Sequence, residues 1–287
     1  MAQRIEEHGL KIVPALHDFI RHYWIIHIQF DPRILNQSPS PKPYPPNTEQ
    51  CLYFYPFDLP HSVPIGSETA LSAASSNIVG QQLTRQNITI NPNYLMLKVS
   101  FHPGALFRLL GVPMYLLADG VADLESITSH TLKEVNERLP EAISYADMIQ
   151  LVETFLLKKA AQCQRDALPI DWVARQMLRS SAYHQLDRLA HDACLSPRQF
   201  ERKFRERVGV SPKLFTRIAR FGQAYKLREA SPDRSWADIA YACDYYDPNH
   251  LVKDFQQFAG TTPSQLFADE LALQQFFSAC EQASLRE

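Results

Sequence analysis

The carboxyl-terminal third of the chain contains one sequence pattern twice. The first copy is LDRLAHDACLSPRQFERKFRERVGVSPKLF, residues 186–215, and the second is WADIAYACDYYDPNHLVKDFQQFAGTTPSQLF, residues 236–267. The early parts of the two copies align at an offset of 50 and the later parts at an offset of 51, because the second copy has one extra residue in the middle. A repeat of this length predicts two structural units of the same kind.

In each copy, two short helices are expected on either side of a tight turn. A strong start signal precedes the second helix. Ser196 can accept backbone hydrogen bonds as its N-cap, and Pro197 suits the first helical position, where a missing N–H costs little. Asp247 and Pro248 occupy the same places in the second copy. A capped helix after a tight turn is typical of a helix-turn-helix unit, so the sequence predicts two such units.

The second helix of the first copy is expected to have a basic outer face. Phe200, Phe204 and Val208 recur every four residues, so they should turn inward together. The other face then holds four hydrogen-bond donors: Arg198, Gln199, Arg202 and Arg205. Over residues 196–228 there are ten basic side chains and two acidic ones, although the whole chain has a formal net charge of −2. A charged outer face is also common on solvated helices, but the cap, the turn and the repeat favour contact with DNA bases and phosphates.

The segment between the two copies, SPKLFTRIARFGQAYKLREAS, predicts one connecting helix. A helix of about 18 residues is about 27 Å long. It could therefore hold two recognition helices near the roughly 34 Å that separates successive major grooves on one face of B-DNA. We expect Arg217 and Arg220 of this helix to contact phosphates or to lie in solvent, and not to contact bases.

The first hundred residues predict a β-rich fold, because short apolar runs alternate with proline and polar clusters. The clearest strand is LMLKVSF, residues 95–101, where apolar residues at odd positions indicate one face on a core. The prolines in SPSPKPYPPN predict a loop, since proline removes the backbone donors that a sheet needs. A polyproline ligand for a partner is the alternative interpretation of that segment.

Helices are expected from Pro103 onward, where apolar residues recur at three and four. An apolar stripe over residues 145–160 favours core contacts, with a subunit interface as the alternative. The chain should therefore be an α+β protein. It should have a β-rich sensor or dimerisation domain with a helical end, a DNA-binding domain and a helical tail, at residues 1–165, 166–270 and 271–287. The helix-turn-helix units should cover about residues 183–209 and 235–260.

Several classes of protein are disfavoured by what the sequence lacks. There is no apolar signal core and no run of about 18 apolar residues, so we expect a cytoplasmic protein that does not enter the membrane. The five cysteines are far apart and form no CxxC pair, so no disulfide framework or zinc site is indicated. No HxH pair followed by Glu, no GxSxG and no glycine-rich phosphate loop occurs, so we expect no metal, no cofactor and no catalytic residue.

The two repeats together resemble a known family. The segments F..KFRE..G.SP and DP.HL.KDF..F.G.TP.QL, within about residues 170–268, are similar to the double helix-turn-helix of AraC/XylS regulators. The amino-terminal part is similar to the β-barrel, cupin-like sensor modules of that family, in the subgroup with a HYW motif (His22, Tyr23, Trp24) and a FHPGA…LLG segment (Phe101 to Gly111). The resemblance implies a sequence-specific DNA-binding transcription regulator, either an activator or a repressor.

The resemblance also implies which side chains contact bases. In the first recognition helix these are Arg198, Glu201 and Arg202, and in the second they are Asn249, His250 and Lys253. Gln199 and Arg205 are added from the helical wheel. The second unit is less suited to a polyanion, because residues 233–258 contain two basic and five acidic side chains. We therefore expect the first helix to supply most of the specific affinity, and the second to position the protein or contact RNA polymerase.

By the same resemblance, the amino-terminal domain should bind a small-molecule effector that shifts DNA binding. Tyr23, Trp24, Tyr53 and Tyr55 could line the pocket, although aromatic residues in strands more often belong to a core. Two alternatives stay open. The domain could instead mediate only dimerisation or contact with another protein, or it could be a cupin-type enzyme, with or without a metal, fused to a DNA-binding module.

Overall fold

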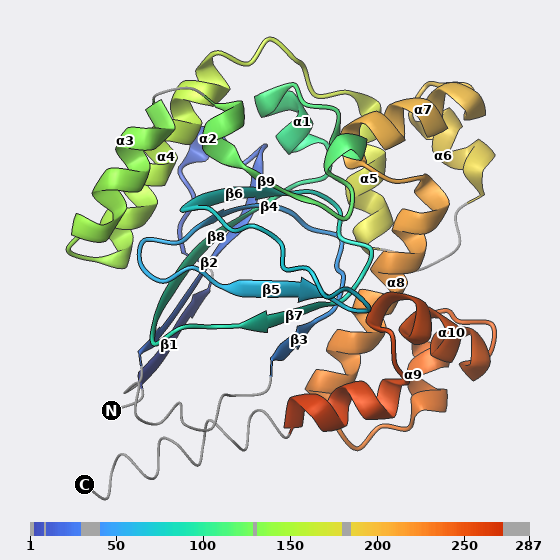
Figure 1. The fold of residues 1–287 in the computed structure, drawn as a ribbon. Coiled ribbons are helices and arrows are strands. Elements are labelled where there is room, and N and C mark those ends of the chain that lie inside the picture. The colour runs from blue at the N-terminus through green and yellow to red at the C-terminus, as the bar shows by residue number, and fades with distance from the viewer. Residues whose placement is uncertain (1–2, 9, 30–40, 129–130, 180–184, 272–287) are drawn as a thin grey trace, which may run out of the picture.

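The computed structural model describes residues 3–8, 10–29, 41–128, 131–179 and 185–271. Antiparallel sheets form the amino-terminal part, and helices form the carboxyl-terminal part beside them (Figure 1). This arrangement confirms the expected α+β class. Within these ranges, no helix is both long and apolar enough to cross a membrane. The predicted helical tail beyond Leu271 lies outside the described residues.

The larger sheet has six strands in the order β1-β2-β8-β4-β6-β9. In that order their bounds are Gln3–His8, Ile20–Gln29, Asn93–Phe101, Gln50–Phe54, Ser76–Val79 and Val121–Asp123. The predicted strand at 95–101 is part of β8, and Leu95, Leu97 and Val99 enter the main core as expected. The other face of β8 is covered too, since Met96 and Lys98 are also buried.

A smaller sheet lies across that second face, in the order β3-β7-β5. Its strands are Lys42–Tyr44, Gln86–Thr89 and His61–Pro64. The interpretation of the whole proline-rich segment as a loop was wrong at β3, where Pro43 pairs with Asn87. Because β3 is an edge strand, a residue without an N–H can be accommodated there. Residues 38–40 of the same segment lie outside the described part of the chain.

Helices follow the sheets where apolar periodicity predicts them. They are α1 (Ala105–Leu110), α2 (Leu124–Ile127), α3 (Thr131–Arg138) and α4 (Tyr145–Ala161), with short 3-10 turns η1 (Pro14–Leu16), η3 (Met114–Leu117) and η4 (Leu139–Glu141). Helix α1 ends at Gly111, which has a φ of 73°. Met148, Val152, Phe155 and Leu156 of α4 are buried in the same core as the larger sheet. The stripe on α4 therefore contributes to the core, and a subunit interface over residues 145–160 stays a prediction.

The remaining helices are α5 (Pro169–Arg179), α6 (Leu186–Asp192), α7 (Pro197–Val208), α8 (Pro212–Ala230), α9 (Trp236–Ala242) and α10 (Pro248–Ala259). They enclose two apolar cores. One surrounds Phe200, Phe204 and Phe215, and the other surrounds Phe221 and Phe255. Helix α8 contributes to both, so it is the connecting helix that the sequence predicts. The expected domain limits stay predictions.

Candidate nucleic-acid interface and effector pocket

The two helix-turn-helix units have the same backbone in their turns. Cys194 and Asp244, at an offset of 50, both adopt the left-handed region, with φ values of 55° and 56°. Gly209 and Gly260, at an offset of 51, end the second helices with φ values of 96° and 67°. Non-glycine residues seldom adopt a positive φ, so its occurrence at equivalent positions is a specific sign of a true structural repeat.

Both second helices begin where the sequence predicts. Gln199 N donates to Ser196 Oγ at 3.4 Å, and Ser196 N donates back to Gln199 Oε1 at 3.1 Å, which is a reciprocal capping box. In the second unit, His250 N donates to the Asp247 carboxylate at 2.9 Å. This backbone hydrogen bond holds the pKa of Asp247 below its usual value. Pro197 and Pro248 occupy the first helical positions.

The predicted DNA-contacting side chains all lie on accessible faces of α7 and α10. On α7 the exposed residues are Arg198, Gln199, Glu201, Arg202 and Arg205, and on α10 they are Asn249, His250 and Lys253. The opposite faces are closed, since Phe200, Phe204, Leu251 and Phe255 are fully buried. The face that begins at Arg198 is therefore free to meet a partner.

Helix α8 holds these two helices at different places along its length (Figure 1). It has 19 residues, and a helix of that size is about 28 Å long. Phe221 of α8 packs edge-on against Phe255 of α10, with ring centroids 4.7 Å apart. Phe215, at the start of α8, packs against Phe204 of α7, with ring centroids 5.4 Å apart. One helix thus fixes both recognition helices through aromatic contacts.

The two arginines of α8 have a different role from the predicted one. Arg217 Nη2 lies 2.6 Å from Asp254 Oδ1, and Arg220 Nη2 lies 3.6 Å from Asp254 Oδ2. Arg220 also lies over the Tyr245 ring, 4.2 Å from its centroid. Asp254 is 4% exposed, so this cluster joins α10 to α8 inside the domain. Neither arginine lies free in solvent, because both pair with Asp254, and contact of either one with phosphates stays a prediction.

This cluster also changes the meaning of the charge count in the second unit. Asp254 is neutralised by α8, Asp247 accepts a backbone hydrogen bond at the start of α10, and the Asp238 carboxylate accepts a hydrogen bond from the Ser235 hydroxyl at the start of α9. The face of α10 that carries Asn249, His250 and Lys253 has no acidic side chain among its exposed residues. It is still less basic than the face of α7, which has three arginines and one glutamate.

The comparisons with known proteins agree with this geometry. Residues 189–269 match the family model of a helix-turn-helix domain. The chain is therefore a DNA-binding transcription regulator with a helix-turn-helix domain. This domain is of the AraC type. No curated protein matches the chain.

Three solved structures illustrate the similarity. The DNA-binding domain of AdpA, in complex with a target DNA, is 29% identical over 37% of this chain and 96% of that chain, with a TM-score of 0.35. ToxT from Vibrio cholerae is 14% identical over 80% of this chain and 94% of that chain, with a TM-score of 0.45. The AraC-like transcriptional activator CuxR is 12% identical over 78% and 95% of the two chains, with a TM-score of 0.27.

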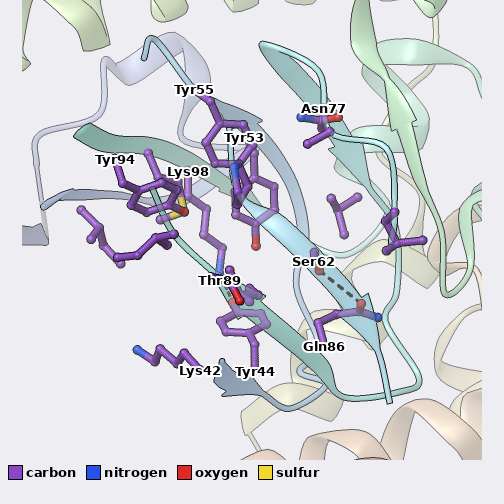
Figure 2. A pocket seen from close by; sticks show the side chains of 18 of the residues that line it. Lys42, Tyr44, Tyr53, Tyr55, Ser62, Asn77, Gln86, Thr89, Tyr94 and Lys98 are labelled. Carbon is purple, nitrogen blue, oxygen red and sulfur yellow. Dashed lines mark hydrogen bonds between the residues drawn. The ribbon is translucent and has the colours of Figure 1, made fainter. Parts of the chain in front are cut away.

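A cavity of about 210 Å³ lies between the two sheets (Figure 2). Its aromatic lining from the sheet domain consists of Trp24, Tyr44, Tyr53, Tyr55 and Tyr94. The DNA-binding part also contributes to the wall, through Tyr225 and Glu229 of α8 and through Glu270. The cavity is thus formed by both parts of the chain.

Three of the four aromatic residues predicted for a pocket line this cavity, but Tyr23 does not. Neighbouring residues on a strand point to opposite faces, so Tyr23 and Trp24 cannot line the same side of β2. Tyr23 is fully buried in the main core, and its hydroxyl donates to Glu153 Oε1 at 2.9 Å. Burial, together with this hydrogen bond, raises the pKa of Tyr23. Tyr23 is therefore a core residue.

Sequence reasoning missed a buried charged pair at the cavity. Lys98 is 1% exposed, and its Nζ donates to Glu49 Oε2 at 2.5 Å and to the Tyr44 hydroxyl at 3.0 Å. Burial alone would raise the pKa of Glu49, but the charges of Lys98, His22 and Arg21 outweigh it and hold this pKa at about 2. The available signal was a lysine in the middle of an otherwise apolar strand, where an unpaired ammonium would be costly.

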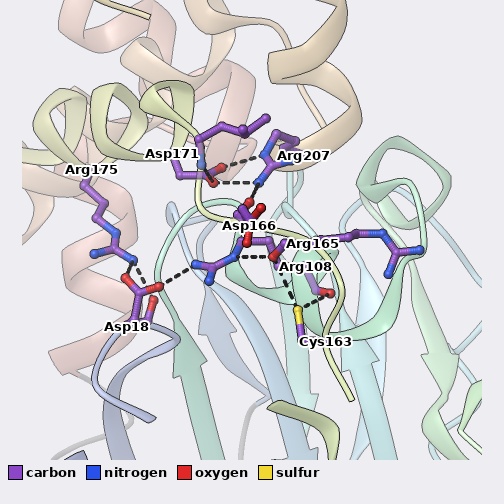
Figure 3. A network of polar contacts seen from close by, with 9 residues as sticks. Asp18, Arg108, Cys163, Arg165, Asp166, Asp171, Arg175 and Arg207 are labelled. Carbon is purple, nitrogen blue, oxygen red and sulfur yellow. Dashed lines mark hydrogen bonds and ion pairs between the residues drawn. The ribbon is translucent and has the colours of Figure 1, made fainter. Parts of the chain in front are cut away.

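A second polar network joins the first helix-turn-helix unit to the sheets (Figure 3). Arg207, near the end of α7, donates to both oxygens of Asp171 at 2.6 Å, and both side chains are buried. The Arg207 guanidinium also lies 5.0 Å from the ring centroid of Phe107 in α1. Asp18 accepts from Arg108 at 2.7 Å and from Arg175 of α5 at 2.9 Å. The first unit is thus anchored while the start of α7 stays free.

Gly104 explains how closely these parts approach. A Cβ atom at Gly104 would lie 2.1 Å from Asp171 Oδ1, and the residue has a φ of 80°. Both the space and the backbone therefore require glycine in the FHPGA segment. Among the described residues, no group of three or more His, Cys, Asp or Glu side chains is placed to hold a metal ion.

Proposed function

We propose that α7 and α10 enter two neighbouring major grooves of double-stranded DNA and contact bases directly. The observation that carries this proposal is the exposure of Arg198, Arg202, Asn249 and Lys253 on helices whose opposite faces are buried. The length of α8 also agrees with the groove spacing of about 34 Å.

The side chains suit distinct base edges. Arg198 and Arg202 can each donate two hydrogen bonds to the O6 and N7 atoms of guanine. Asn249 can bind the N6 and N7 atoms of adenine in the same bidentate manner, and Glu201 can accept from the N4 amine of cytosine. Gln199, Arg205, His250 and Lys253 would complete the contacts to bases and phosphates.

Selection of bound duplexes from a random DNA library tests this proposal. We expect an enriched motif with two conserved blocks whose centres lie about 10 base pairs apart, one for each recognition helix. The variant R198A should lose selectivity in one block and N249A in the other. A matched control is R138A on α3, which should leave the motif unchanged because Arg138 lies on an exposed helix of the sheet domain. A single uninterrupted block, or no enrichment at all, would contradict the two-helix arrangement.

We also propose that a small molecule in the cavity controls DNA binding. Because the cavity wall includes Trp24 and Tyr53 from the larger sheet and Tyr225 from α8, a bound molecule would touch both parts of the chain. A ligand that fits one relative position of the two parts better than another shifts the population toward it. A thermal-shift screen against metabolites tests this step, since a ligand of the folded state raises Tm by mass action. A hit should also change operator affinity.

The rest of the function follows from this proposal. The protein is proposed to act in the cytoplasm as an activator or repressor and not as an enzyme. We also propose that it contacts RNA polymerase and forms a homodimer. The main competing hypothesis is an amino-terminal domain that only dimerises or binds another protein. It predicts no hit in the metabolite screen and a concentration-dependent change of mass in solution.

A further inference from the structure

We infer that the cavity between the sheets binds a small planar aromatic molecule through one acceptor oxygen, which receives a hydrogen bond from Lys98. This inference rests on the proposed function, because it names the chemical class of the effector for the same cavity.

The walls favour a flat ligand. The rings of Tyr53 and Tyr55 are stacked, with centroids 6.1 Å apart and an interplanar angle of 9°. Tyr94 continues this surface, with its ring centroid 6.0 Å from that of Tyr55. Aromatic faces gain more from offset or edge-on contact with another ring than from burial alone. A saturated chain would bury the same apolar area without that gain.

The size of the cavity limits the ligand. A dry apolar cavity of about 150 Å³ can admit benzene. The cavity here measures about 210 Å³, so it suits roughly one to two fused rings. A much larger ligand would not fit in this volume.

Lys98 supplies the polar contact. Its ammonium has three N–H donors, of which one goes to Tyr44 and one to Glu49. The third has no oxygen acceptor within the described part of the chain. The ammonium lies 5.3 Å from the ring centroid of Trp24 and 5.8 Å from that of Tyr53. Figure 2 shows Lys98 extending into the cavity toward Tyr44. A ligand oxygen would satisfy the remaining donor.

The charges around Lys98 favour an anionic or strongly accepting oxygen. Glu49 is the carboxylate partner of Lys98, and it also lies 3.8 Å from Arg21 and 3.5 Å from His22. Two permanent cations therefore share one carboxylate. A carboxylate or phenolate oxygen on the ligand would add the missing negative charge, and a carbonyl oxygen would accept the hydrogen bond without adding charge.

The wall contributed by the DNA-binding part has the opposite preference. Glu229 and Glu270 both line the cavity there, and Tyr225 donates a hydrogen bond to Glu270. Burial is the main cause of the raised pKa of each carboxyl. A second acidic group on the ligand would face these carboxyls, even though Lys42 offsets part of their charge. The ligand should therefore have one acceptor end only.

Three probes separate the elements of this inference: 2-naphthoate, octanoate and 2-naphthylmethylamine. Binding to the full chain is measured by isothermal titration calorimetry. We expect 2-naphthoate to bind at least about ten-fold more tightly than octanoate, which has the same carboxylate without rings. The amine, which has the rings with a cation instead of an acceptor, should bind more weakly than either. Equal affinity for 2-naphthoate and octanoate, or preference for the amine, would overturn the inference.

The double variant K98M/E49Q tests the contact with Lys98 without leaving a lone buried charge. It should bind 2-naphthoate about ten-fold or more weakly than the native chain, because a hydrogen bond to a charged donor is lost. The control E229Q changes only the wall that α8 contributes, and it should keep or slightly raise the affinity. Unchanged affinity in K98M/E49Q would remove Lys98 from the site. If that variant fails to fold, the ranking of the three probes still decides.

Failure of this inference is distinct from failure of the proposed function. If none of the three probes binds but a metabolite raises Tm and changes operator affinity, the ligand class is wrong and effector control stands. If 2-naphthoate binds with the expected ranking, the ligand class stands whether or not operator affinity changes. If 2-naphthoate binds in this way but neither it nor any metabolite changes operator affinity, the proposal of effector control is wrong.

Discussion

The two helix-turn-helix units share a backbone but use their charged residues differently. In the first unit, the basic residues of α7 are exposed at its start, and only Arg207 is buried at its end against Asp171. In the second unit, the buried charge is Asp254 in the middle of α10, and its partners come from α8. The repeat offset of 51 makes the contrast plain, because Lys203 is the counterpart of Asp254 and Phe258 is the counterpart of Arg207.

This contrast separates two groups of residues in the same fold: those that form a helix-turn-helix unit and those that attach it to its neighbours. The shared features are caps, apolar positions and left-handed residues, which every helix-turn-helix unit needs in order to form. The charges that differ decide what each unit is attached to. In the first unit, Arg207 pairs with Asp171 of α5 and lies over Phe107 of the sheet domain, whereas the second unit is joined to the connecting helix through Asp254. We therefore expect the two units to respond differently to loss of their buried pairs.

The largest effect is expected for D171A. It would leave the Arg207 guanidinium buried without its carboxylate, and breaking a buried pair in this way costs about 3–5 kcal/mol. The free energy of unfolding from urea titration measures this change. The double variant D171L/R207M removes both charges and should recover most of the loss. A double variant no more stable than D171A would show that the pair itself, and not the lone charge, accounts for the stability.

A smaller loss is expected for D254A. Its partner Arg217 keeps 31% of its side chain exposed and can turn to water, so we expect a cost of about 1–3 kcal/mol. The matched control is K203A, at the equivalent position of the first unit, which should change stability by no more than about 0.5 kcal/mol because Lys203 is only half-buried. If K203A were as destabilising as D254A, the two units would not differ in the way described.

DNA affinity offers a third test, since Arg202 and Lys253 are also counterparts at the offset of 51. R202A should lose about 1–3 kcal/mol of binding free energy, the value of one bidentate base contact. K253A should lose less, because one lysine cannot make the two-pronged contact that a guanidinium makes. Fluorescence anisotropy with one operator at one salt concentration compares them directly, since salt alone changes affinity strongly. Equal losses would refute the asymmetry between the units.

The sequence predicts the local parts of these units well. Ser196 followed by Pro197, and Asp247 followed by Pro248, specify helix starts by chemistry within four residues. The four-residue spacing of Phe200 and Phe204 likewise identifies the face that turns inward.

What the sequence does not predict are contacts between distant residues. Nothing near Arg217 indicates that its partner is Asp254, 37 residues away. Tyr23 and Trp24 alternate as a strand requires, but both faces of β2 are covered, so alternation cannot say which face holds the cavity. Pro43 fits a strand only because β3 is at an edge, and the neighbours of a strand are set by the whole fold. The predicted base contacts belong to neither group, since only binding can test them.

The smallest effects are expected at the helix caps, where the units differ in their response to pH. S196A should cost about 1 kcal/mol of stability at any pH, because a hydroxyl cap does not titrate. The Asp247 cap is a carboxylate whose pKa is lowered from 3.8 in the folded chain. A lowered pKa in the folded state means that the cap stabilises at neutral pH and loses this effect as pH falls below about 4.

The second unit alone should therefore lose cap strength in acid. Measuring unfolding free energies of the native chain, S196A and D247N between pH 7 and pH 3 tests this prediction. The cost of D247N should shrink as pH falls, because the native chain then loses the charge that the variant lacks. The cost of S196A should stay constant. Parallel pH profiles for all three proteins would contradict the difference between the caps. They would indicate that the charge of Asp247 does not contribute to its capping effect.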